Sequence, residues 1–249
     1  MSTKPVIVIV PGAWSSPAFY SQMQSYLTEL GFPSELAMHP SIGAEPANKT
    51  LEDDIANLRR ILTRLSDSGN EILILAHSYG GLVSSSAVEG FQKSERQCQG
   101  KTGGVAMIIY MVAFVVPKGQ SVVAASGGNL MPWIKTEGNY TYCDIGADGA
   151  FHDLPPQEQE TWIAALRHTA LPVFSGVVSY EPWHSLPTAY ILGEEDRMLP
   201  LSIQEGMAKM LGTPHMYRLK SSHHPFLSMP KKVAEIIDEL EMLLQKEVQ

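Results

Sequence analysis

The stretch Ile72-Leu73-Ile74-Leu75-Ala76-His77-Ser78-Tyr79-Gly80-Gly81 joins an apolar run to a turn of small residues. Four consecutive aliphatic residues are typical of a parallel strand that is buried on both faces. The small-x-Ser-x-Gly pattern then places Ser78 at the tip of a sharp turn, before a helix that we expect from Gly80 to about Gln97. Ala76 stands where the commoner pattern has glycine, and alanine is small enough for the turn to close. An ordinary connecting turn is the alternative interpretation.

Further strands and helices alternate along the chain on both sides of this turn. Apolar runs predict strands at 6–10, 105–116, 188–192 and 215–219, with a weaker strand around 35–38. Apolar residues at helical spacing predict helices at 16–30, 50–65, 201–211 and 230–244, and Thr50 and Asp53 can cap the second of these. This alternation predicts an α/β fold, with a mostly parallel sheet of about six strands and helices on both faces.

Residues 117–185 interrupt the alternation with a mixture of proline, glycine, tryptophan and polar residues. Only 156–167 is predicted to be helical in this segment. A structureless loop of this length is rare inside a compact domain, so we predict a small inserted cap. The expected organisation is one domain over 1–249, with its core at 1–116 and 186–249 and its cap at 117–185.

The composition is globular and argues against two classes of partner. Hydrophobic residues make up 44% of the chain, which is enough for a single core. The net charge is −8 and the longest basic runs are pairs, so neither nucleic acid nor a membrane surface is an expected partner. The apolar run at 6–10 is too short for a signal peptide or a membrane span, and we predict a soluble cytoplasmic protein. Nothing in the sequence indicates the oligomeric state.

No motif for a metal, a nucleotide or a disulfide is present, so no cofactor is predicted. Cys98 and Cys143 lie far apart and lack metal-ligand spacing, which predicts two buried free thiols. The sequence contains neither GxGxxG nor GxxxxGK[ST]. Six histidines without metal-ligand spacing are expected to be structural or to lie on the surface: His39, His77, His152, His168, His184 and His215.

A serine hydroxyl becomes an effective nucleophile only with a base beside it, an acid that orients the base, and N–H donors for the oxyanion. The base for Ser78 is expected after the last strand, where His223 and His224 are neighbours. Successive side chains cannot both face the serine. The acid is expected after strand 188–192, where the carboxylates of Glu194-Glu195-Asp196 compete.

Two backbone N–H groups are required for the oxyanion. One belongs to Tyr79, the residue after the serine, and the other is expected from Ala13 in the loop Pro11-Gly12-Ala13-Trp14. An ordinary turn is again the alternative for this loop. Trp14 is expected to form a wall of the substrate pocket. Three further tryptophans fall in the predicted cap, where they either line an apolar pocket or pack the cap itself: Trp133, Trp162 and Trp183.

With these residues the sequence resembles the α/β-hydrolase superfamily over essentially its whole length. Within it, the sequence is similar to the branch of plant methyl-ester esterases, hydroxynitrile lyases and related fungal hydrolases. Members carry a segment like His-x-Pro-x-Leu-Ser-x-Pro around the base, which 223–230 matches with His223 in the base position. Their acid segment, Gly-x-x-Asp-x-x-x-Pro, matches 193–200 and selects Asp196. The resemblance implies an α/β-hydrolase fold and a triad of Ser78, Asp196 and His223.

Departures from the family pattern narrow the implied chemistry. Pro11 stands where members usually have histidine before Gly12. The hydroxynitrile lyases carry threonine at the place of Gly12 and lysine at the place of His224, so their route to cyanohydrin cleavage is not expected here. Serine rather than aspartate at position 78 disfavours epoxide-hydrolase and haloalkane-dehalogenase chemistry.

The resemblance therefore implies a serine hydrolase that cleaves a carboxylic ester, lactone or thioester of a small hydrophobic molecule through an acyl-enzyme. One alternative is a lyase, or carbon–carbon bond chemistry on a polyketide-like substrate, that uses the same triad. Another is a ligand-binding receptor on a hydrolase scaffold, which a complete serine, acid and histidine set argues against.

Overall fold

The chain folds around a parallel β-sheet, seen in a computed structural model that describes residues 4–247. Its strands are β1 (Val6–Val10), β2 (Ser34–Leu36), β3 (Glu71–His77), β4 (Gly104–Met111), β8 (Thr188–Gly193) and β9 (His215–Leu219). They lie in the order β2-β1-β3-β4-β8-β9, and every neighbouring pair is parallel. The predicted α/β fold with six strands is confirmed.

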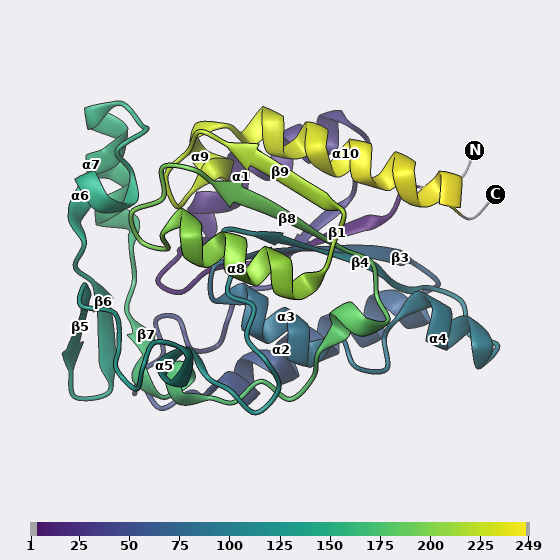
Figure 1. Cartoon of the computed structure of the whole chain (residues 1–249), viewed down its shortest axis with the longest axis horizontal. Coiled ribbons are helices and arrows are strands. Elements are labelled where there is room, and N and C mark those ends of the chain that lie inside the picture. The colour runs from purple at the N-terminus through teal and green to yellow at the C-terminus, as the bar shows by residue number, and fades with distance from the viewer. Residues whose placement is uncertain (1–3, 248–249) are drawn as a thin grey trace.

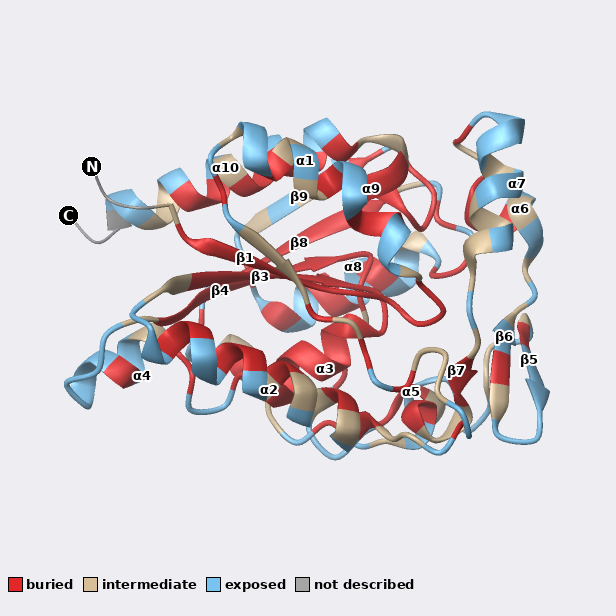
Figure 2. Cartoon of the chain, turned by 180° about the vertical axis from the view of Figure 1, so that it is seen from behind, coloured by how far each residue is buried: buried red, intermediate tan, exposed pale blue. Residues whose placement is uncertain are grey.

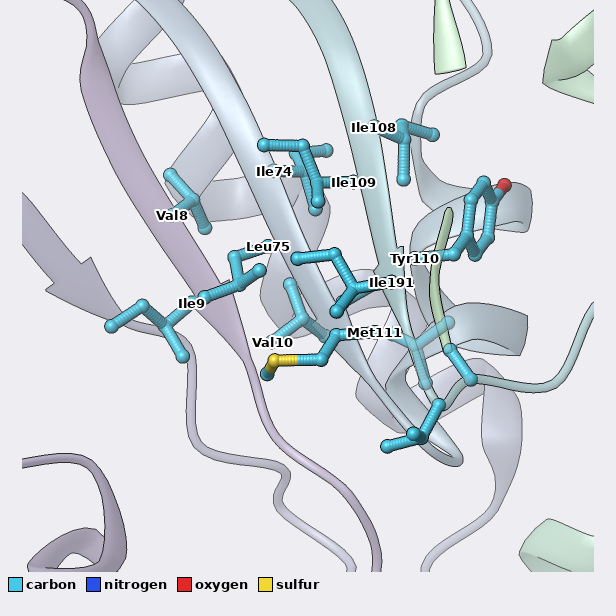
Figure 3. Packing of buried hydrophobic residues seen from close by; sticks show 14 of the residues in the cluster. Val8, Ile9, Val10, Ile74, Leu75, Ile108, Ile109, Tyr110, Met111 and Ile191 are labelled. Atoms are coloured by element: carbon cyan, nitrogen blue, oxygen red, sulfur yellow. The ribbon is translucent and has the colours of Figure 1, made fainter. Parts of the chain in front are cut away.

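The four central strands are buried because helices cover both faces of the sheet. All residues of β1, β4 and β8 are buried, as is β3 after its first residue. Figure 3 shows Val8 and Ile9 of β1 packed beside Ile74 and Leu75 of β3. Strand β9 lies at the edge of the sheet, and its residues alternate between exposed and more buried positions. The continuous apolar runs thus form the buried central strands, and the run that alternates in burial forms the edge strand β9.

Two layers of helices enclose the sheet. Helices α1 (Ser21–Glu29) and α10 (Pro230–Glu247) cover one face, and α2 (Leu51–Asp67) and α3 (Gly80–Ala87) cover the other (Figures 1 and 2). The remaining core helices are α4 (Lys93–Cys98), α8 (Leu201–Leu211) and the short α9 (Pro225–Ser228). Thr50 and Asp53 form the predicted capping box of α2. Within residues 4–247, no helix is both long enough and apolar enough to cross a bilayer.

Two helix boundaries differ from the prediction. The helix expected from residue 80 to 97 is divided into α3 and α4 because Gly90 adopts a left-handed φ of 82°. The segment between the two helices is held to the sheet, where the carbonyl of Phe91 accepts a hydrogen bond from the N–H of Val105. The helix expected at 16–30 begins instead with a 3-10 turn, Pro17–Tyr20, and becomes α-helical at Ser21.

The strand expected at 105–116 ends at Met111. Val112 adopts a positive φ of 42°, and the chain then leaves the sheet so that the N–H of Phe114 donates to the carbonyl of Ser78.

The prediction of two buried thiols was also wrong. Cys98 is exposed at the end of α4 and Cys143 is half-buried, because the first ends a surface helix and the second ends a strand of the small sheet described next.

A second, smaller assembly occupies the carboxyl ends of the core strands, opposite both chain termini (Figure 1). It contains an antiparallel sheet of β5 (Ile134–Glu137), β6 (Tyr140–Cys143) and β7 (Thr169–Ala170). Its helical segments are α5 (Val122–Ala125), α6 (Gly146–Ala150), α7 (Pro156–Ala165), η2 (Leu171–Ser175) and η3 (Pro182–His184). The helix predicted at 156–167 is present as α7. The sheet was not predicted, because its strands are short and largely polar.

We expect the centre of the sheet to dominate stability. Ile74 is fully buried on β3, and Ile74→Ala should lower the free energy of unfolding by about 2–5 kcal/mol because it removes apolar contacts and leaves a cavity. Ile203→Ala makes the same chemical change on the surface of α8, where half of the side chain is exposed, and should change stability by less than about 0.5 kcal/mol. Urea unfolding measures both; equal losses would contradict the assigned core.

Candidate active site

Ser78 lies at a strained turn between β3 and α3. Its φ of 50° is left-handed, a conformation that non-glycine residues seldom adopt. The turn is held on the side of β4, where the Ser78 carbonyl accepts a 3.0 Å hydrogen bond from the Phe114 N–H. Gly81 makes this approach possible, because a Cβ there would lie 2.2 Å from the Phe114 carbonyl oxygen. This sharp turn places the Ser78 hydroxyl beyond the end of β3, where it contacts His223.

Ser78, His223 and Asp196 form one hydrogen-bonded chain. The Ser78 Oγ lies 2.9 Å from Nε2 of His223, and Nδ1 of His223 lies 2.7 Å from Oδ2 of Asp196. A carboxylate only accepts, so Nδ1–H donates to Asp196 and Nε2 is left to accept the serine proton. The N–H groups of Met198 and Leu199 donate to Oδ1 of Asp196 at 2.8 and 2.9 Å, which holds the acid in place.

The neighbours that competed for these positions point elsewhere. The ring of His224 stacks on Phe151 with centroids 4.6 Å apart, and its Nδ1–H donates to the carbonyl of Ala150. Glu195 is exposed and Glu194 is half-buried. Successive residues diverge at each loop, so one histidine contacts Ser78 and one carboxylate contacts that histidine.

The loop after β1 lines the site and leaves one N–H group without an acceptor among residues 4–247. The N–H of Gly12 donates to Oη of Tyr20 at 3.1 Å, and the N–H of Trp14 donates to Oγ1 of Thr169 at 2.9 Å. Between them, the N–H of Ala13 has no acceptor within residues 4–247. The two flanking bonds orient the loop and leave this donor available.

The N–H of Tyr79 is the second available donor. It precedes the first turn of α3, and no acceptor contacts it in the described part of the chain. Tyr79 and Ala13 line the same cavity as Ser78 and His223. The carbonyl oxygen of a substrate beside Ser78 would therefore lie near two N–H groups without acceptors. Two such donors are the arrangement that stabilises an oxyanion.

Two small cavities meet at Ser78 and His223. One has a largely apolar lining that includes Phe114, Met131, Trp133, Phe174 and Leu199. The other is lined in part by His77, Cys143, Leu166 and His224. Neither cavity has an aspartate, glutamate, lysine or arginine among its described lining residues.

Trp14 borders both cavities. Its ring stacks on Phe174 at 5.5 Å and meets Trp133 edge-on at 5.6 Å. Trp133 therefore lines the site. Trp162 instead packs on Phe19, which lies outside the predicted cap, with ring centroids 4.9 Å apart, and Trp183 lies beside His184.

Three titratable side chains that line the second cavity, His77, His224 and Cys143, are uncharged at neutral pH. Burial and the neighbouring imidazoles lower the pKa of His77 and of His224 well below the usual value. Burial raises the pKa of the Cys143 thiol to about 11. The thiol thus stays protonated and is a poor nucleophile. No cluster of histidine, cysteine, aspartate and glutamate among residues 4–247 has the geometry to hold a metal ion.

Comparison with known proteins agrees with this architecture. The alpha/beta hydrolase family model matches residues 7–236. The chain belongs to the α/β hydrolase family. The α/β hydrolase nvfD of Aspergillus novofumigatus is 29% identical over 94% of this chain and 95% of its own. A chloroplastic protein of Arabidopsis thaliana, whose name describes it as a methylesterase, is 25% identical to this chain. The match covers 75% of this chain and 52% of the Arabidopsis protein.

Solved structures share the fold at lower identity. The pyrethroid hydrolase of Sphingobium faniae superposes with a TM-score of 0.71 at 21% identity, over 96% of this chain and 98% of its own. Polyneuridine aldehyde esterase gives a TM-score of 0.76 at 16% identity, over 95% and 99%. The predicted resemblance to the branch of plant esterases and fungal hydrolases is confirmed.

Two residues that support the site of this α/β hydrolase were not found from the sequence. Thr169 binds the Trp14 N–H, and the carbonyl of Thr141 accepts from the Trp14 indole Nε1 at 3.1 Å. Both threonines lie on the small antiparallel sheet, more than a hundred residues from Trp14 along the chain. Neither stands in a motif, and no local pattern marks the contact.

We expect Gly12 to be essential for the geometry of the site. An added Cβ would lie 2.7 Å from Nδ1 of His77 and 3.0 Å from Cβ of Ser78, so Gly12→Ala must displace the loop that carries Ala13. Activity toward a small ester should fall by about 100-fold or more, as when one oxyanion donor is lost. Gly206→Ala on α8 meets open space and should retain full activity. Steady-state kinetics compares the two; an active Gly12→Ala variant would contradict the packing.

Proposed function

We propose that this chain is a carboxylic ester hydrolase that works through an acyl-enzyme. The observation that carries the proposal is the hydrogen-bonded chain from Ser78 through His223 to Asp196. As Ser78 Oγ attacks the ester carbonyl, Nε2 of His223 takes its proton, and Asp196 stabilises the imidazolium that forms. The protonated His223 then returns the proton to the leaving alcohol as the carbon–oxygen bond breaks.

The N–H groups of Ala13 and Tyr79 are the proposed oxyanion donors. Negative charge develops on the carbonyl oxygen during both acylation and deacylation, so the same two donors assist both steps. In the second step water takes the place of the alcohol. His223 removes a proton from the water, the hydroxyl attacks the acyl carbon, and Ser78 leaves with the proton that His223 returns. Water is the only co-substrate that the reaction requires.

The proposed substrate is neutral and hydrophobic. Both cavities beside Ser78 lack charged side chains among the described residues, and Trp14 and Trp133 supply aromatic walls. In this proposal residues 117–185 form a cap that encloses the ester, because Trp133 and Phe174 come from that segment. The name hydrolase of the fungal relative is consistent with this reaction class.

Replacement of Ser78 tests the nucleophile directly. Ser78→Ala should abolish turnover of an activated para-nitrophenyl ester, because no acyl-enzyme can form, and should also abolish labelling by a fluorophosphonate probe. Ser84→Ala is the matched control: Ser84 is fully buried on α3 and should be dispensable for both. Circular dichroism verifies that both variants fold. Undiminished turnover in folded Ser78→Ala would end the proposal.

The charge of the substrate tests the apolar pocket. Para-nitrophenyl valerate should be hydrolysed with a kcat/KM about 100-fold or more above that of para-nitrophenyl hemisuccinate, which carries a carboxylate at a similar distance from the ester. Burial of an unpaired carboxylate costs several kcal/mol. A parallel measurement of spontaneous hydrolysis corrects for intrinsic reactivity. Equal kcat/KM values would show that a cation or solvent reaches the bound acyl chain.

A further inference from the structure

A fully buried carboxylate lies behind the candidate site. Asp54 is on α2, in its first turn, and has no exposed surface. Among residues 4–247, no lysine, arginine or histidine nitrogen lies within 4.0 Å of its oxygens. Burial of such a group is costly unless hydrogen bonds replace its hydration. Its neighbours must therefore supply donors.

Three donors satisfy Asp54, and two of them come from one residue. The N–H of Ser41 donates to Oδ1 at 3.0 Å, and the Ser41 hydroxyl donates to Oδ2 at 2.6 Å. The third donor is the phenolic hydroxyl of Tyr79, at 2.8 Å from Oδ2. Burial and the Asp54 charge raise the pKa of Tyr79 well above its usual value, so the phenol keeps its proton and donates. Hydrogen bonds to a charged acceptor are about twice as strong as neutral ones.

Tyr79 is also the residue whose backbone N–H is the proposed oxyanion donor. Its side chain extends from the elbow to Asp54 on α2, while its N–H has no acceptor among residues 4–247 and the residue lines the cavity at Ser78. The hydrogen bond to Asp54 therefore holds Tyr79 by the far end of its side chain. Because Tyr79 precedes α3 and adjoins a strained serine, rotation of its peptide would be the local way to release that strain.

The same group of side chains reaches the loop that carries the other donor. The ring of His39 meets the Tyr79 ring edge-on, with centroids 5.1 Å apart. Its Nε2–H donates to the carbonyl of Pro11 at 2.8 Å, two residues before Ala13. Burial lowers the pKa of His39, so the imidazole is neutral and packs against the phenol without an opposing charge. Both proposed donors are thus anchored to one buried cluster.

We propose that Asp54 is a positioning residue that acts through Tyr79 to hold the oxyanion N–H in its productive orientation. The inference rests on the proposed function, since it needs an oxyanion at Ser78. A carboxylate that served the fold alone could be paired with any buried donor. Among residues 4–247, the one side chain other than that of Ser41 that binds Asp54 is that of Tyr79, the residue after the nucleophile.

Tyr79→Phe removes the hydroxyl that Asp54 binds and leaves the backbone N–H in the chain. We expect kcat for a para-nitrophenyl ester to fall by about 10-fold, less than the loss of an entire donor, with KM within twofold because the oxyanion exists only after attack. Inhibition by a trifluoromethyl ketone, which forms an oxyanion on Ser78, should weaken by the same factor.

Tyr110→Phe is the matched control. Tyr110 on β4 is equally buried, and its hydroxyl makes a 2.8 Å hydrogen bond to Ser85, away from the cavities. Both variants lose one buried phenolic hydroxyl, and Tyr79→Phe should lower the unfolding temperature more because its hydroxyl binds a carboxylate. Only Tyr79→Phe should lose kcat. If both variants retain kcat, or both lose it equally, the positioning role is overturned.

Asp54→Asn completes a double-mutant cycle with Tyr79→Phe. If Asp54 acts through the Tyr79 hydroxyl, the double variant loses no more kcat than the larger single loss. Additive losses would overturn the proposal, and Tyr79→Phe decides alone if Asp54→Asn does not fold. Full activity in Tyr79→Phe with none in Ser78→Ala refutes the positioning role and leaves the hydrolase intact. Activity in Ser78→Ala refutes the hydrolase itself.

Discussion

The turn at Ser78 is the constraint on which the rest of the site depends. A left-handed serine lies there between glycines that let three segments of the chain pack closely. Gly12 lets the loop after β1 approach the elbow, and Gly81 lets α3 approach Phe114. The close approach brings the Ala13 loop, the serine and the segment after β4 together at the carboxyl edge of the sheet. The strain is local, and the buried parallel strands on either side hold it in place.

The parallel sheet then determines where partners for the serine can come from. Every core strand ends at the same edge, so the loops after β8 and β9 converge on the loop after β3. Those loops supply Asp196 and His223 from positions far along the chain. Each is held by further bonds: the N–H groups of Met198 and Leu199 bind the acid, and the imidazole N–H of His77 donates to the carbonyl of His223 at 2.9 Å. The side chains are thus oriented before a substrate arrives.

The cavities beside Ser78 are apolar and have no aspartate, glutamate, lysine or arginine among their described lining residues. The nearby carboxylates lie outside these linings. The carboxylates of Asp196 and Asp54 are both buried and both satisfied by hydrogen bonds, one beneath the base and one beneath Tyr79. Burial keeps the imidazoles of His77 and His224 uncharged. In such surroundings the two backbone N–H groups proposed as oxyanion donors would act more strongly than in water, because the local dielectric constant is low.

The sequence by itself predicted the sheet and the elbow at Ser78, since continuous apolar runs and the small-x-Ser-x-Gly turn are local patterns, and the family resemblance selected Asp196 and His223 from their neighbours. Residue periodicity also located α2 and α10, although it missed the break at Gly90 and the end of β4 at Met111. The tertiary structure alone decided the antiparallel sheet, the walls of the cavities and the cluster around Asp54. These depend on contacts between residues distant in sequence, whose side chains carry no local signal because their partners come from other elements.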